Sequence, residues 1–145
     1  MRSLLDVNVL IALLDSGHTH HLAATSWLEK EVRHGWASCP ITQNGCIRVM
    51  SQPAYPQALP ATLVAQRLAE AAQGRDHEFW PDDVNLLEPG NCDWSRILGH
   101  RQVTDVYLLL LAVKHGGRLV TLDRRISVES VPQAGADQLA IIRAS

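Results

Sequence analysis

The chain has 145 residues, of which 46% are hydrophobic and 19% are charged, and its formal net charge is −2 at pH 7. This length fits a single domain over residues 1–145 that can bury a core without disulfide staples. The composition is ordinary for a globular protein and carries no overall basic signal for nucleic acid, although the charge around a site matters more.

Cysteine usage and hydropathy exclude further classes of protein. Cys39, Cys46 and Cys92 are odd in number and form no CxxC pair. This argues against a disulfide framework or a cysteine-based zinc site and favours a reducing cytoplasm. Asp6 interrupts the apolar N-terminal stretch, so no signal peptide is expected. The chain has no run of about 18 uninterrupted apolar residues, so no membrane span is predicted.

In the first third of the chain, short apolar runs alternate with amphipathic ones. Residues 3–5 are predicted to form a buried strand that leads into a helix around residues 9–14. Residues 20–32 place their apolar side chains on one helical stripe, and residues 36–39 form a short strand between a glycine and a proline. Thr42 is the expected N-cap of the helix that follows.

The middle of the chain is richer in turn-forming residues. The stretch SQPAYPQALP holds three prolines and predicts a loop, and residues 59–72 predict an amphipathic helix that ends before Gly74. A short strand is expected around residues 84–87, which lie between two prolines. Residues 91–102 are polar enough to predict a loop with a brief helical turn.

The C-terminal third again alternates helix and strand. Almost every residue from 106 to 113 is apolar, which predicts a helix buried on nearly all faces. Thr104 is its expected N-cap, and Gly116 is expected to end it. Strands are predicted over residues 118–122 and 139–142. Helices that alternate with short apolar strands indicate an α/β fold whose parallel sheet is covered on both faces.

Three aspartates follow or precede predicted apolar segments where strand gives way to helix. They are Asp6 in SLLDVNVL, Asp105 in VTDVYLLLL and Asp123 in RLVTLDRRI. Such junctions lie at the carboxyl edge of a parallel sheet, where ligands bind. Carboxylates that converge there repel one another and are tolerated together mainly when a divalent cation neutralises them. The pattern therefore predicts a metal-dependent enzyme that acts on a phosphate-bearing substrate.

Each aspartate also has a purely structural interpretation. Asp6 and Asp105 could stabilise the start of the helices beside them, and Asp123 could form an ion pair with Arg124 or Arg125. Taken singly, these roles are favoured, whereas three such positions together favour a shared site. A receiver or phosphatase fold is disfavoured because the first motif is DVN, without a second acidic residue, and neither lysine follows a predicted strand. A nucleotide-binding enzyme is disfavoured because GxGxxG and P-loop motifs are absent.

The motifs around these aspartates resemble those of a known family. LLDVNVLIALL, CPITQNGCIRV, FWPDD and RQVTDVYLLLLAVKHGGRLVTLDRRI together resemble the PIN-domain family, specifically the VapC-type toxins of bacterial type II toxin–antitoxin systems. The resemblance implies a three-layer α/β/α fold with a central parallel sheet. It also implies an Mg²⁺- or Mn²⁺-dependent endoribonuclease, an RNA substrate, a homodimer, and a cognate antitoxin that keeps the toxin inactive.

The acidic quartet of that family falls on Asp6, Gln43, Asp105 and Asp123. Gln43 departs from the pattern because many relatives carry glutamate there, and its amide can offer a carbonyl oxygen but no charge. Weaker cation affinity is therefore expected. The alternative is a catalytically weakened PIN module that acts by binding RNA or a partner.

The expected roles follow from the resemblance. Asp6, Asp105 and Asp123 are the expected metal ligands and catalytic residues, with Asp123 bound directly or through water. A supporting shell around them is expected to include Gln43, Asn8 and Thr104. Four arginines flank the motifs and could contact RNA phosphates, although a plain surface role is equally favoured. They are Arg48, Arg101, Arg124 and Arg125.

Two further clusters invite interpretation. His18, His20 and His21 suggest a zinc site, but no matching Cys or His pair accompanies them and a solvated loop is favoured. Asp82 and Asp83 could lie at the rim of the metal site, although a solvated turn is the favoured interpretation.

Overall fold

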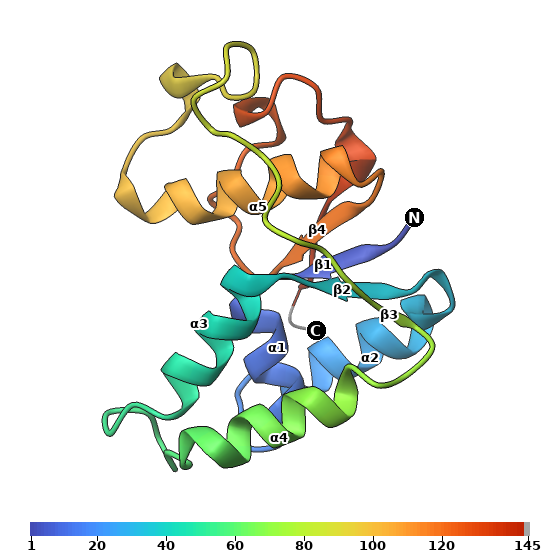
Figure 1. Ribbon diagram of the computed structural model, residues 1–145, viewed down its shortest axis with the longest axis vertical. Coiled ribbons are helices and arrows are strands. Elements are labelled where there is room, and N and C mark those ends of the chain that lie inside the picture. The colour runs from blue at the N-terminus through green and yellow to red at the C-terminus, as the bar shows by residue number, and fades with distance from the viewer. Residues whose placement is uncertain (144–145) are drawn as a thin grey trace.

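The computed structural model describes residues 1–143, and its five strands form one parallel sheet in the order β3-β2-β1-β4-β5 (Figure 1). From β1 the chain adds β2 and β3 on one side of β1, and then adds β4 and β5 on its other side. The strand order therefore reverses between β1 and β4, a place where parallel α/β sheets bind ligands. The strands are β1 (Ser3–Leu5), β2 (Trp36–Ser38), β3 (His77–Phe79), β4 (Arg118–Thr121) and β5 (Leu139–Ile141).

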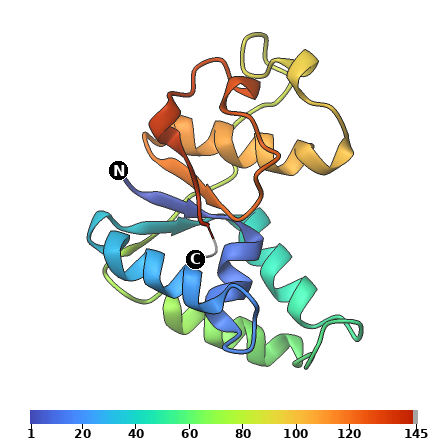
Figure 2. The ribbon, with the colours of Figure 1, turned by 180° about the vertical axis from the view of Figure 1, so that it is seen from behind.

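Helices cover both faces of this sheet (Figures 1 and 2). Four helices lie on one face, and the fifth lies with the long loops on the other. The structure thus confirms the predicted three-layer α/β/α fold with a central parallel sheet. The helices are α1 (Val7–Leu14), α2 (His21–Glu31), α3 (Pro40–Met50), α4 (Ala61–Ala71) and, alone on its face, α5 (Val103–Lys114).

The alternation of side chains along the central strands divides the core into two parts. Leu4 pairs in register with Leu119, and both pack on the α5 side. Leu5 pairs with Val120, and both pack on the side of α1, α3 and α4. Because both faces of β1 and β4 are buried, the residues that follow these strands are held firmly at the carboxyl edge.

The apolar helix α5 has the expected burial but an earlier start. Its residues Val106 and Leu108 to Ala112 are buried, and Gly116 ends the segment with a positive φ of 67°. The expectation that Thr104 is the N-cap was wrong, because the helix begins at Val103 and continues a preceding turn over His100–Gln102.

Among residues 1–143, no helix combines the length and apolarity that crossing a membrane requires.

Thr42 is also not an N-cap. The helix α3 begins at Pro40, whose ring suits the first helical position. Thr42 lies in the first turn and is buried, and its hydroxyl oxygen accepts a hydrogen bond from the backbone N–H of Cys39 at 2.9 Å. The hydroxyl therefore stabilises the helix start from inside the helix.

The strand predicted around residues 84–87 was wrong. Val84 and Leu86 instead belong to a loop that packs against α5. The third strand is His77–Phe79, which pairs with β2 at the edge of the sheet. Its Glu78 and Phe79 are exposed. This strand lies at the edge of the sheet and pairs with one neighbour only. It carries no apolar pattern from which it could be predicted.

Candidate active site

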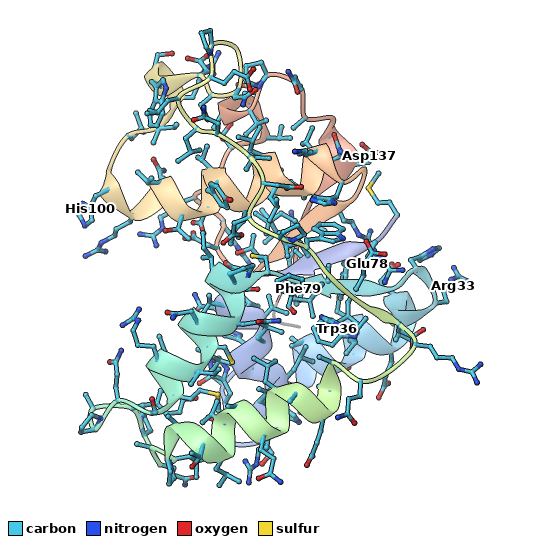
Figure 3. The ribbon with its side chains drawn as sticks, viewed as in Figure 1. Arg33, Trp36, Glu78, Phe79, His100 and Asp137 are labelled. Atoms are coloured by element: carbon cyan, nitrogen blue, oxygen red, sulfur yellow. The ribbon has the colours of Figure 1, made fainter. Side chains whose placement is uncertain are left out.

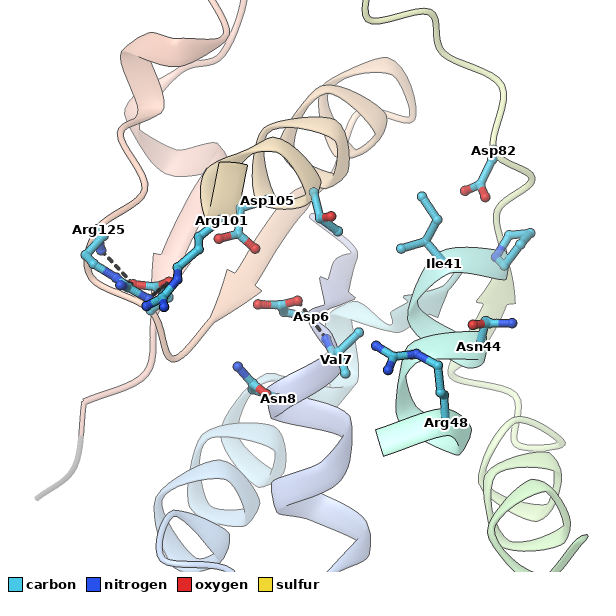
Figure 4. Close-up of a pocket in the computed structure, with 14 residues that line it drawn as sticks. Asp6, Val7, Asn8, Ile41, Asn44, Arg48, Asp82, Arg101, Asp105 and Arg125 are labelled. Atoms are coloured by element: carbon cyan, nitrogen blue, oxygen red, sulfur yellow. Dashed lines mark hydrogen bonds and ion pairs between the residues drawn. The ribbon is translucent and has the colours of Figure 1, made fainter. Parts of the chain in front are cut away.

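A cavity of about 640 Å³ opens at the carboxyl ends of β1 and β4, between the N-terminal ends of α1, α3 and α5 (Figure 4). Gly45 allows α3 to approach α1 here, because a Cβ at this position would meet Val7 Cγ2 at 2.6 Å. The polar residues that line the cavity are Asp6, Asn8, Asn44, Arg48, Asp82, Arg101, Thr104, Asp105, Asp123 and Arg125.

Asp6 is the most buried of the three predicted aspartates. Only 5% of the residue is exposed, and it precedes α1 as its N-cap. One carboxylate oxygen accepts a hydrogen bond from Val7 N at 2.7 Å, and the other accepts one from Thr121 Oγ1 at 2.8 Å. Burial raises the pKa of Asp6, and these hydrogen bonds oppose the rise. The carboxylate is therefore held in one orientation at the floor of the cavity.

Thr121 is a site residue that the sequence analysis missed. Its buried hydroxyl donates to Asp6 and accepts from the backbone N–H of Asp123 at 3.1 Å. One side chain thus links the Asp6 carboxylate after β1 to the backbone of Asp123 after β4. The only local signal is a hydroxyl at the end of an otherwise apolar strand, two residues before an aspartate.

Asp105 extends from the first turn of α5 toward Asp6 (Figure 4). Burial first, and then the charges of Asp6 and Asp123, raise the pKa of Asp105 to about 7. Asp105 thus lies at the start of a helix, as predicted, and is also repelled by the other carboxylates, as predicted. Such a pKa is the expected result of carboxylates that share a partly enclosed site.

Asp123 is engaged by a cation from its own loop. Arg125 Nε lies 3.1 Å from Asp123 Oδ1, and Arg125 Nη2 lies 3.1 Å from Oδ2. The Arg125 backbone N–H also donates to Oδ1 at 2.9 Å. These contacts lower the pKa of Asp123. The ion pair considered as a structural role for Asp123 is thus present, at the rim of the same cavity.

Gln43 does not line the cavity. Its Nε2 donates a hydrogen bond to Ser38 Oγ at 2.9 Å. The neighbouring Asn44 is exposed and lines the cavity instead. The Gln43 amide is therefore hydrogen-bonded at the end of β2.

The other predicted residues are divided between two cavities. Asn8 and Thr104 line the cavity with the aspartates, and so do Arg48 and Arg101. Arg124 lines a neighbouring cavity. Asp82 also lines the main cavity, whereas Asp83 forms ion pairs with Lys114 and His115 on the far side of the loop.

The oxygen donors of this cavity suit a hard divalent cation. Burial and the neighbouring carboxylates both raise the pKa of Asp105. Over residues 1–143, however, no three His, Cys, Asp or Glu side chains are close enough together to hold one ion. Asp6 and Asp105 could hold a cation with water completing its shell, as Mg²⁺ commonly requires. Asp123 could join them if Arg125 moved aside.

Comparison with known proteins gives a family and close relatives. The family model described as the PIN domain matches residues 3–128. Ribonuclease VapC44 of Mycobacterium tuberculosis is 49% identical over 142 residues, which cover 98% of this chain and 100% of that protein. Ribonuclease VapC39 of the same organism is 44% identical over 129 residues, which cover 88% of this chain and 92% of that protein.

Solved structures share the fold at low sequence identity. A crystal structure of VapBC2 from Rickettsia felis, bound to a DNA fragment from its promoter, matches with a TM-score of 0.62 and 14% identity, covering 97% of this chain and 98% of that one. The structure of Mycobacterium tuberculosis VapC20, a sarcin–ricin-loop-cleaving toxin, matches with a TM-score of 0.56 and 12% identity, covering 81% and 86%.

Proposed function

We propose a function from the premise that this chain belongs to the PIN-domain family, as a VapC-type member. The chain is an endoribonuclease that hydrolyses RNA phosphodiester bonds, and it acts as the toxin of a toxin–antitoxin pair. The relatives named as ribonucleases support this assignment over nearly the whole chain.

The observation that carries the proposal is the meeting of three carboxylates at one cavity. Asp6, Asp105 and Asp123 reach it from three different segments, at the place where the strand order reverses. Arg48 and Arg101 line the same cavity from α3 and from the turn before α5. Negative ligands for a cation beside guanidinium groups for phosphates suit the hydrolysis of a phosphodiester.

The proposed cofactor is Mg²⁺, with Mn²⁺ as a substitute. Asp6 and Asp105 would bind it directly, and Asp123 would bind it directly or through water. When bound, the cation supplies positive charge at the phosphate and a lower pKa for water. Thr121 keeps Asp6 oriented through its 2.8 Å hydrogen bond, as groups behind a metal ligand commonly do.

The protein's own groups then divide the remaining tasks. Arg48 and Arg101 neutralise and orient the RNA backbone beside the aspartates. Hydrolysis requires a group that accepts a proton from the attacking water, and an Asp105 carboxylate oxygen that the cation does not engage is the proposed acceptor. Asn8, exposed at the start of α1 and lining the cavity, is placed to hydrogen-bond water or a phosphate oxygen.

A cognate antitoxin is the proposed protein partner. The matched Rickettsia felis structure is of VapBC2, a fold neighbour, and an antitoxin segment could place a lysine or arginine among the carboxylates here. The Arg125–Asp123 pair is an example of such a contact within this chain. The family resemblance also predicts a homodimer, which sedimentation of the purified protein would test.

The test is cleavage of total bacterial RNA by the purified, antitoxin-free protein with Mg²⁺, Mn²⁺ or EDTA. We expect discrete fragments that require the metal and that disappear in an Asp105→Asn variant. Asp137→Asn is the matched control, since it removes one carboxylate at an exposed position far from the cavity (Figure 3). No cleavage by a folded protein that still binds RNA would support the weakened PIN module instead.

A further inference from the structure

A second cavity, of about 600 Å³, adjoins the one that holds the aspartates. Asn8, Asp123 and Arg125 line both cavities, so the two meet along these residues. Its volume lies within the roughly 300–1,000 Å³ of ordinary small-molecule sites. The residues that line only this second cavity come from the loop between α1 and α2 and from the segment after β4, and are His18, Thr19, His20, Leu122 and Arg124.

The two histidines of this cavity are arranged by the loop itself. His18 Nδ1 accepts a hydrogen bond from His20 N at 3.0 Å. The two rings lie 5.8 Å apart at 46°. His21 takes no part, because its Nδ1 contacts the Ala12 carbonyl oxygen at 2.7 Å. The cavity is therefore lined by two half-buried imidazoles that a hydrogen bond within the loop brings together.

His20 has an unfulfilled hydrogen-bonding atom. Its Nδ1 is buried and has no hydrogen-bond partner among residues 1–143. Because this atom is buried, the part of His20 that lines the cavity is the rest of its ring. Burial lowers the pKa of His18, which leaves the His18 ring mostly uncharged at neutral pH. An uncharged imidazole offers one donor, one acceptor and a flat face.

Two arginines from the segment after β4 also line the cavity. Arg124 is exposed, and Arg125 has a side chain that is 63% exposed. A zinc site is disfavoured, because no group of three His, Cys, Asp or Glu suited to a metal occurs in residues 1–143. Imidazoles and guanidinium groups in one cavity suit a nucleotide, whose base stacks and hydrogen-bonds while its phosphate pairs with arginine.

We propose that this second cavity is a nucleotide subsite, in which His18 and His20 receive a base of single-stranded RNA while Arg124 contacts its phosphate. This inference rests on the proposed function only in taking RNA as the ligand. Because the cavity adjoins Asp123, the bound nucleotide is a neighbour of the one whose phosphate is cut. The histidines would therefore help to select the sequence at the cleavage site.

The experiment measures binding in EDTA, where metal-dependent cleavage is prevented. Fluorescein-labelled octamers of rA, rC, rG and rU are titrated with the full chain and followed by anisotropy. We expect the native protein to prefer one base over the weakest by at least about threefold. The double variant His18→Ala, His20→Ala should bind the preferred octamer about tenfold more weakly, as for the loss of a base–aromatic contact, and should lose the preference.

Two further variants make the result specific. Arg124→Gln, at an exposed position, should weaken all four octamers similarly and leave the base preference intact. His34→Ala is the matched control, because His34 is exposed and lies outside both cavities. If the double histidine variant does not fold, as judged by thermal melting, the single variant His20→Gln replaces it.

The outcomes separate this inference from the nuclease assignment. Base-selective binding that depends on the histidines, together with no cleavage of total RNA, would remove the nuclease and keep the subsite. Cleavage with unchanged binding and unchanged base preference in the histidine variants would keep the nuclease and overturn the subsite. That second result would assign the cavity to another class of ligand, such as a peptide.

Discussion

Gln43 donates a hydrogen bond to Ser38 across the end of β2, and this bond directs its amide away from the cavity that holds the aspartates. Ser38 is fully buried, and its Oγ also lies 2.8 Å from His77 Nε2. With Gln43 as donor, the Ser38 hydroxyl is free to donate to His77. A hydrogen bond from the His77 ring to the backbone of Ala72 then completes a directed chain.

Replacing Gln43 by glutamate would remove the donor to Ser38, because a carboxylate can only accept a hydrogen bond. The Ser38 hydroxyl could then donate either to the new carboxylate or to His77, but not to both. We expect the new carboxylate in Gln43→Glu to turn toward the cavity and tighten Mg²⁺ binding by about threefold to tenfold, since ligand charge tunes cation affinity. Calorimetric titration measures the effect. Asn44→Asp is the comparison, because Asn44 already lines the cavity. Tighter binding in Asn44→Asp alone would exclude position 43 from the cation site.

Thr121 is expected to act through Asp6. In Thr121→Val the shape is kept, but the 2.8 Å hydrogen bond to Asp6 and the 3.1 Å bond from Asp123 N are lost. Because the first bond opposes the rise in the pKa of Asp6, that pKa should rise further. Metal affinity or RNA cleavage should fall about 10- to 100-fold.

The readouts for Thr121 are cation affinity and the pH profile of cleavage, whose acidic limb should move upward. Thr121→Ser retains the hydroxyl and should restore both. A Thr121→Val protein with an unchanged profile and only a lower melting temperature would show that the hydroxyl is structural.

Arg125 competes with any cation for Asp123. Because its guanidinium contacts both oxygens of Asp123 at 3.1 Å, Arg125→Gln should free the carboxylate and tighten Mg²⁺ binding by about threefold, a modest gain for an exposed pair. RNA binding should weaken, since a phosphate contact is lost. Arg75→Gln, an exposed site outside the cavity, is the control. Weaker Mg²⁺ binding after Arg125→Gln would contradict this account.

The raised pKa of Asp105 predicts how stability depends on pH without metal. A carboxyl group whose pKa is higher in the folded state, here about 7, stabilises the fold fully below its unfolded pKa of about 4. That stability is lost as the pH rises from about 4 to 7. After allowance for partial exposure, the loss should be about 1–2 kcal/mol.

Urea unfolding in EDTA at pH 5 and pH 7.5 measures this difference. Asp105→Asn cannot ionise and should lack it, and saturating Mg²⁺ should reduce it in the native protein by compensating the charge. The lowered pKa of Asp123 acts with the opposite sign and at lower pH. If the difference in stability between the native protein and Asp105→Asn is the same at both pH values, the pKa of Asp105 is not raised.

The proposed toxin role makes a prediction in cells. Overproduction of the chain alone should arrest bacterial growth, and Asp6→Ala should relieve the arrest because the most buried cation ligand is removed. Growth curves with immunoblots of protein level measure both. Equal toxicity of the two forms at equal abundance would remove Asp6 from the catalytic assignment. Asp6 also caps α1, so the melting temperature of Asp6→Ala must be measured as well.

Local sequence patterns determined the layered fold and the segments that carry the aspartates. Most apolar residues of β1, β4 and the middle of α5 are buried, so composition alone marks these segments. Asp6, Asp105 and Asp123 stand out because each interrupts or borders such a run. The edge strand His77–Phe79 was not predicted, because backbone hydrogen bonds hold it to β2 and its side chains show no apolar pattern.

Only the tertiary structure decided which side chains meet. Neither the turn of Gln43 toward Ser38 nor the place of His18 and His20 beside Asp123 leaves a local signal. The hydroxyl at the end of β4 is visible in the sequence, but its bond to Asp6 is not. The pKa of Asp105 likewise depends on charges that precede and follow it at a distance along the chain. Periodicity reports which face of a segment is buried, whereas hydrogen bonds and charge interactions depend on distances that packing alone sets.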